Sequence, residues 1–119
     1  MPTKVSKRLV QINVRYRDVS FIDDTDSPYS VLATDEMIHA DPTLGIIDID
    51  LEPGASIAPG RQITVRDQKG LADVNNITIT PNGTDTINSG NQLALAVAWD
   101  CVVLEWDGVS DWAIVSTKG

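Results

Sequence analysis

Apolar and polar residues alternate along short stretches of this chain, which is the pattern of strands that bury one face. Stretches rich in glycine, proline, asparagine and aspartate separate them and predict turns. Seven strands are predicted, at residues 37–40, 46–51, 62–66, 77–80, 93–98, 101–106 and 112–116. The last two flank Asp107-Gly108, which predicts a hairpin. Because no window has the spacing of an amphipathic helix, the sequence predicts an all-β fold, a compact antiparallel β-sandwich or barrel-like domain.

The N-terminal segment has the same alternation but a different composition. Four apolar residues, at Val10, Ile12, Val14 and Tyr16, alternate with polar or basic ones. A solvated tail has no reason to place four apolar side chains on one face, so we expect the segment to dock either on its own domain or on another chain. The polar residues 23–28 are typical of a turn-rich junction. The sequence thus predicts an extended basic arm and linker at residues 1–26 and a β-rich domain at residues 27–119.

Charge is distributed unevenly between these parts. The chain of 119 residues has a net charge of -8, yet residues 1–17 carry five basic residues and no acid, which gives +5. Residues 18–119 hold four basic and seventeen acidic residues, which gives -13. The acidic total argues against a nucleic-acid partner, and no apolar run reaches the roughly 20 residues that cross a membrane. The asymmetry predicts two surfaces with different partners.

The residues that carry chemistry form no recognisable catalytic or metal-binding pattern. His39 and Cys101 are the only histidine and cysteine, too few for a zinc site and without the third group of a nucleophilic triad. The acidic run 23–26 lacks the spacing of a calcium-binding loop. Asp48, Asp50 and Glu52 alternate along one strand face, which fits a calcium site or a solvated polar face. We expect no enzyme, no cofactor and no metal.

Each of the three tryptophans, Trp99, Trp106 and Trp112, has an aspartate beside it. Aromatic rings next to carboxylates suit the binding of sugars, whereas a tryptophan beside a hairpin also suits core or cross-strand packing. The candidate glycan-binding residues are Trp106, Asp107, Asp111 and Trp112.

Five segments occur in an order that resembles a β-module of tailed-bacteriophage structural proteins. They read "VLATDEMIHAD", "GIIDIDLEPG", "PGRQITVRD", "NNITITPNGTDTI" and "VVLEWDGVSDWAIVS", and together span Val31 to Ser116. Modules of this kind are found in capsid decoration (cement) proteins, head fibres and tail fibres, and usually assemble as trimers. The resemblance therefore implies a homotrimeric protein of the virion, assembled in the cytoplasm of a host bacterium.

The candidate trimer interface consists of the apolar faces of three predicted strands, Ile47, Ile49, Leu51, Ile77, Ile79, Leu93 and Leu95. The alternative is that these residues form the core of one subunit.

The short arm leads to the expected function, a capsid decoration protein on the outer surface of a phage head. The arm would clamp neighbouring major capsid subunits through Lys4, Lys7, Arg8, Val10, Ile12, Val14, Arg15, Tyr16 and Arg17. The alternative is a tail-fibre or head-fibre module that binds a host surface glycan.

Overall fold

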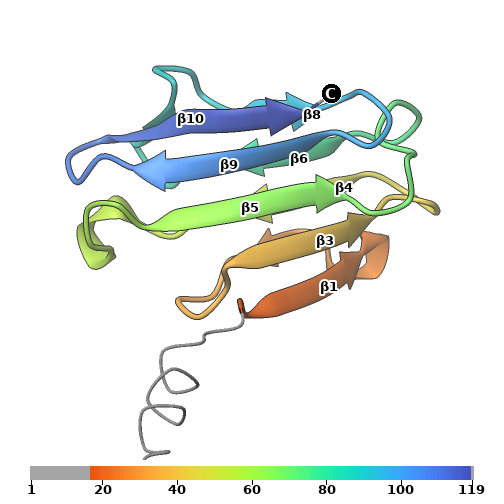
Figure 1. The fold of residues 1–119 in the computed structure, drawn as a ribbon, viewed down its shortest axis with the longest axis horizontal. Helices are drawn as coiled ribbons and strands as arrows, with labels where there is room; N and C mark the ends of the chain where they lie inside the picture. Colours follow the sequence, from red (N-terminus) through yellow and green to blue (C-terminus); the bar gives the residue numbers. More distant parts are fainter. Residues whose placement is uncertain (1–16, 119) are drawn as a thin grey trace, which may run out of the picture.

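The computed structural model describes residues 17–118, which fold into two stacked β-sheets (Figure 1). The strands are β1 (Val19–Asp23), β2 (Tyr29–Ser30), β3 (Met37–Asp41), β4 (Ile47–Asp50), β5 (Gln62–Asp67), β6 (Ile77–Thr80), β7 (Thr86–Ile87), β8 (Leu93–Leu95), β9 (Cys101–Trp106) and β10 (Asp111–Lys118). Two 3-10 turns, η1 (Asp24–Asp26) and η2 (Gly54–Ser56), interrupt the connections. Within residues 17–118, neither helical segment has the length or apolarity to span a membrane. The predicted all-β class is confirmed.

The first six strands alternate between the two sheets. The front sheet has the order β1-β3-β5-β9-β10-β7, and the back sheet has the order β2-β4-β6-β8. Each passage from front to back and forward again adds one parallel strand beside its predecessor, as in a solenoid. Figure 1 shows β1 at one edge of the front sheet, with β3, β5, β9 and β10 following in turn.

The predicted antiparallel arrangement is wrong for this first part of the chain. Five of the eight strand pairings among the described residues are parallel, and three are antiparallel. The cause is the winding, because each strand leads into the opposite sheet instead of returning beside itself by a hairpin. Only the end of the chain reverses direction, and there β9 and β10 form the predicted hairpin.

The boundary predicted at residue 26 lies inside the domain. β1 pairs with β3 along its whole length, from Val19 beside Met37 to Asp23 beside Asp41. The polar segment that follows β1 is the first crossing between the sheets. In it, the carboxylate of Asp23 accepts from the Thr25 backbone N–H at 2.9 Å, and Asp26 accepts from the Asp23 N–H at 2.9 Å. This reciprocal cap forms a tight 3-10 turn, so the acidic run ends a strand instead of linking an arm to the domain.

The core lies between the two sheets and is filled by the inward faces of their strands. Its largest members are Trp106 and Trp112, whose rings pack at 5.5 Å and 55°. η2 passes close to this pair, since a Cβ on Gly54 would lie 2.2 Å from the Trp106 ring. The position of Gly54 therefore depends on the absence of a side chain.

One carboxylate is completely buried in this core. Asp67, at the end of β5, accepts four backbone N–H groups, from Lys69 at 3.1 Å, Gly70 at 2.9 Å, Ala72 at 2.9 Å and Trp99 at 2.9 Å. Burial alone raises the pKa of Asp67, but these hydrogen bonds to the ionised form outweigh it and lower the pKa. Asp67 thus ties the connection after β5 to the one before β9.

Candidate functional site

The outer face of the front sheet carries one cross-strand row that contains the single histidine and the single cysteine of the sequence. In register, Phe21 of β1 lies beside His39 of β3, then Arg66 of β5, then Cys101 of β9. The Phe21 and His39 rings stack at 5.1 Å and 21°. Burial, and next the charge of Arg66, lower the pKa of His39. His39 and Cys101 are two strand spacings apart, about 10 Å, so the two groups do not meet as a nucleophile and base would.

The edge strand β1 is the exposed apolar feature of this face. Val19 is 41% exposed and Phe21 is 67% exposed, and both point away from the core. Among residues 17–118, β1 pairs only with β3. Within this described part of the chain, its other side therefore presents unpaired strand backbone beside two apolar side chains, which is the arrangement to which another strand adds.

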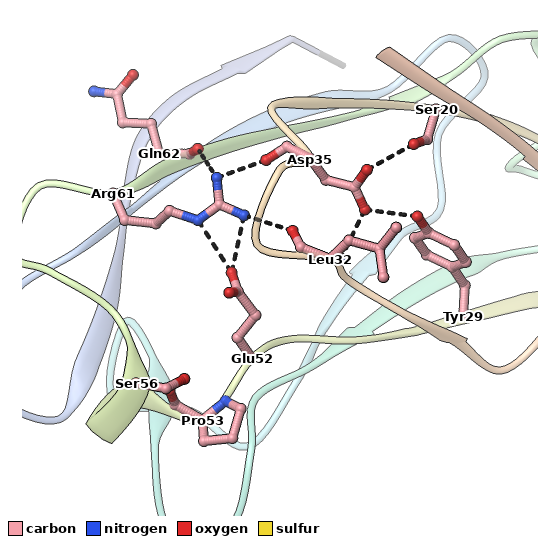
Figure 2. Close-up of polar contacts among 9 residues, drawn as sticks. All are labelled: Ser20, Tyr29, Leu32, Asp35, Glu52, Pro53, Ser56, Arg61 and Gln62. Atoms are coloured by element: carbon pink, nitrogen blue, oxygen red, sulfur yellow. Dashed lines mark hydrogen bonds and ion pairs between the residues drawn. The ribbon is translucent and has the colours of Figure 1, made fainter. Parts of the chain in front are cut away.

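A buried hydrogen-bond network fixes β1 and its neighbours (Figure 2). The Asp35 carboxylate, 3% exposed, accepts from the Ser20 hydroxyl of β1 at 2.6 Å, the Tyr29 hydroxyl at 2.6 Å and the Leu32 backbone N–H at 2.9 Å. Burial of Tyr29 and its bond to Asp35 raise the pKa of its hydroxyl. The bond from Ser20 links β1 to the segment that follows β2, and the bonds from Tyr29 and Leu32 fix the position of Asp35, so the edge strand is held in place by the interior.

Arg61 ties the same segment to the start of β5 (Figure 2). Its guanidinium donates to the backbone carbonyls of Leu32 at 3.0 Å and Asp35 at 2.6 Å, and it pairs with Glu52 at 2.9 Å. Because the guanidinium makes all of these contacts, Arg61 acts as a brace for the loop.

The chain segment that contains β1 to β4 is rich in acidic residues. Residues 18–60 contain ten acids and no lysine or arginine. They are Asp18, Asp23, Asp24, Asp26, Asp35, Glu36, Asp41, Asp48, Asp50 and Glu52. These residues include β1 to β4, so the end of the molecule that presents the open edge also holds most of the negative charge. A basic strand is the partner that such an edge favours.

The predicted arm residues lie largely outside the described part of the chain. Lys4, Lys7, Arg8, Val10, Ile12, Val14, Arg15 and Tyr16 belong to this group. Arg17 is described, and it donates to the Glu36 carbonyl at 3.1 Å and to the Thr64 hydroxyl at 3.1 Å. Arg17 is thus bound to its own domain at the start of β1, from which the arm departs.

The predicted trimer-interface residues lie within a single subunit. Six of them are buried, at 3% exposure or less: Ile47, Ile49, Leu51, Ile77, Ile79 and Leu95. Leu93 is partly buried and packs against the same core. Side chains already enclosed between the two sheets cannot also form a contact surface between subunits. The alternative interpretation, a core within the monomer, describes these positions.

The predicted glycan-binding residues do not form a sugar-stacking surface. Trp106 and Trp112 are each 1% exposed, and their aspartate neighbours shape turns. Asp107 accepts the backbone N–H groups of the β9–β10 hairpin, including that of Val109 at 2.7 Å. Asp111 accepts the backbone N–H of Ser89 at 2.9 Å. Trp106 is the last residue of β9 and Asp107 begins the hairpin, whereas Asp111 and Trp112 are the first two residues of β10. Each tryptophan is therefore next to an aspartate because a buried strand meets a turn at that point.

The acidic clusters do not converge on a metal site. No group of three or more histidine, cysteine, aspartate or glutamate residues within residues 17–118 has the geometry to hold an ion. Glu52, which alternates with Asp48 and Asp50 in the sequence, lies beyond β4 and pairs with Arg61. Asp48 and Asp50 remain on the outer face of the back sheet, where β6 contributes Thr78 and Thr80.

No family model matches the chain, and no curated protein matches its sequence.

Proposed function

We propose that this chain is a structural protein of a tailed-bacteriophage virion, a capsid decoration protein that forms trimers and attaches to neighbouring major capsid subunits through its N-terminal arm. The order of the five segments from Val31 to Ser116 supports the phage module. The two-sheet fold is compatible with a structural protein that binds other proteins through its surface. Many of its polar groups stabilise turns, caps and strand networks.

The observation that carries the proposal is the charge difference between arm and domain. Residues 1–17 have a charge of +5 and residues 18–119 a charge of -13. A basic segment with alternating apolar residues, joined to an acidic domain, can contact a partner in two ways. Its cations contact carboxylates of a partner, and its apolar residues cover a partner strand or groove. Three arms in one trimer would add avidity to individually weak contacts.

Reversing the three charges nearest the N-terminus tests the attachment. The variant carrying Lys4→Glu, Lys7→Glu and Arg8→Glu should bind undecorated heads of the same phage at least about 100-fold more weakly. The reason is that exposed ion pairs of up to about 1 kcal/mol each are lost in all three arms. Co-sedimentation of the purified protein with heads, over a range of salt concentrations, measures this change.

Lys69→Glu is the matched control, because Lys69 is an exposed cation outside the arm. It should leave binding to heads unchanged. Binding by the triple variant as strong as that of the unaltered chain would remove the arm from the attachment mechanism.

A further inference from the structure

We infer that the open edge of β1 accepts residues 10–16 from a second copy of this chain, so that neighbouring subunits exchange arms. The edge is one surface of the described domain, and residues 10–16 are the segment that continues directly from its first described residue, Arg17. The exchange supplies a contact by which the proposed trimer could form, and it rests on the proposed function for the number of subunits.

The backbone of β1 has the geometry to accept a strand. In a parallel ladder, alternate residues of a strand bond to one neighbour and the intervening residues face the other side. The Asp18 carbonyl accepts the Met37 N–H at 3.0 Å, so Asp18, Ser20 and Ile22 face β3. The N–H and C=O groups of Val19 and Phe21 consequently point to the open side. An added strand would bond to these two residues.

The side chains of the two partners also match. Val19 and Phe21 are 41% and 67% exposed on the outer face of the sheet. Val10, Ile12, Val14 and Tyr16 present a row of the same kind at period two. Seven residues extend over about 23 Å, which covers the five residues of β1. Placed on the same face, the arm's apolar row would cover the two exposed side chains of the edge.

Charge is compatible with a copy of this chain as the occupant. Residues 18–60, which include β1 to β4, carry ten acids and no lysine or arginine, whereas the exchanged residues 10–16 carry one cation, Arg15, and no acid. Each copy therefore provides both members of a complementary pair. Direct contact between two acidic domains would be repulsive, and an intervening segment that carries Arg15 and no acid reduces that repulsion.

The arm of the same chain is poorly placed to fill its own edge. To pair with β1, residues 10–16 would have to reverse direction within about two residues, at a turn that favours glycine or asparagine. Positions 14–18 read Val-Arg-Tyr-Arg-Asp and contain neither. Arg17 is also bound to Glu36 and Thr64, and the Asp18 carbonyl is part of the β1–β3 ladder. Arg17 and Asp18 thus bind on the β3 side of β1, opposite to its open edge.

Arm exchange is a head-to-tail contact, because the arm of one copy meets the edge of the next. Such contacts close into rings when the rotation between subunits allows it. A ring of three would form the proposed trimer without requiring contacts between the strand faces that are buried in the core of each subunit. Lys4, Lys7 and Arg8 precede the exchanged strand and stay accessible for the capsid. The two tasks of the arm are then divided along its length.

Val19→Pro tests the exchange at the edge. Proline removes the outward N–H of Val19 and leaves the bonds to β3 in place, since edge strands tolerate proline on their open side. Sedimentation velocity of the full chain should show an oligomer, and Val19→Pro should raise its dissociation constant by about tenfold or more, as expected for a lost hydrogen bond and a blocked approach. A full chain that stays monomeric at 100 µM (roughly 10⁴ times a tight 10 nM constant), or a variant that associates unchanged, would overturn the inference.

A disulfide trap supplies a readout that does not depend on the stability of Val19→Pro. In a Cys101→Ser background, one preparation carries a cysteine in the arm, scanned over Val10, Ile12, Val14 and Tyr16, and the other carries Phe21→Cys. Mixing and oxidation should yield a covalent heterodimer for at least one arm position. Ala94→Cys, exposed on the back sheet, is the control that should not be trapped. If no arm position is trapped with Phe21→Cys, the arm does not lie beside β1 of another copy.

The two proposals fail separately. Lys4→Glu, Lys7→Glu and Arg8→Glu should weaken binding to heads while the oligomer persists. An oligomer that dissociates with Val19→Pro but never binds heads would refute the decoration function and retain the exchange. Binding to heads by a protein that is monomeric in solution would refute the exchange and retain the function.

Discussion

Asp67→Ala is expected to lower the free energy of unfolding by about 3–5 kcal/mol, because it leaves several backbone N–H groups without an acceptor inside the protein. The Asp67 side chain is fully buried and receives four such groups from two separate connections. Alanine supplies no acceptor, and the vacated volume is enclosed by the core. Urea denaturation followed by circular dichroism measures the change.

The same carboxylate makes part of the stability depend on pH. Hydrogen bonds to the ionised form hold the pKa of Asp67 below its ordinary value of 3.8 in the folded protein. A lowered pKa means that this contribution is fully present above about pH 4 and is lost as the pH falls through the folded pKa. Asp67→Asn, which cannot ionise, should therefore be less stable than the unaltered chain at pH 7, and the gap should narrow below pH 4. Asp23 and Asp107, whose pKa values are also lowered, are common to both proteins. A gap of equal size at pH 7 and at pH 2.5, about a unit and a half below the ordinary aspartate pKa, would contradict this account.

Gly54→Ala is expected to cost about 3 kcal/mol through steric conflict in the core. A Cβ at this position would lie 2.2 Å from Cζ2 and 2.3 Å from Cη2 of Trp106, and 3.0 Å from Asp85 Oδ2. The Trp106 ring is packed against Trp112 and cannot move aside. The Gly54 N–H also donates to Asp85 at 2.8 Å, so displacement of the η2 backbone would break a hydrogen bond. The midpoint of thermal unfolding reports the loss.

A double-mutant cycle identifies the clashing partner. Trp106→Phe removes the two ring carbons nearest to Gly54, so Gly54→Ala should cost less in that background than in the unaltered chain. Gly45→Ala is the matched control, because its nearest contact is the Asp24 side chain at 3.2 Å, and it should destabilise far less. Additive effects of Gly54→Ala and Trp106→Phe would show that the ring is not the obstacle.

Alternation in the sequence located the strands well but did not determine how they pair. β6 and β9 have the predicted bounds, and β3, β4, β5, β8 and β10 differ from prediction at one or both ends. A period of two indicates which side chains face inward, and it is the same for parallel and antiparallel neighbours. The direction of β3 beside β1 follows from the crossings through the back sheet, which are long-range features. The short strands β2 and β7 have two residues each, too few to show a period.

The candidate site was harder to predict, because its residues are ordinary in sequence. Val19 and Phe21 were assigned to the arm, and only pairing with β3 identifies them as an edge. The absence of basic residues from 18 to 60 was the signal that could have found this surface. Conversely, Ile47, Ile77 and their neighbours suggested a trimer interface, but a second sheet of the same chain covers them. Asp35 and Asp67 gave no signal, since their partners are backbone N–H groups and hydroxyls, which form no recognisable sequence pattern.

The order of the front sheet has a consequence for synthesis on the ribosome. β7 is synthesised before β10, which is its partner strand in residues 17–118. A nascent chain that has not yet emerged past Ser110 therefore holds β9 without its hairpin partner and lacks Trp112 beneath Trp106. Completion of the front sheet therefore waits until the residues of β10 have left the ribosome, and a chain stalled before that point would present unpaired strand edges to chaperones.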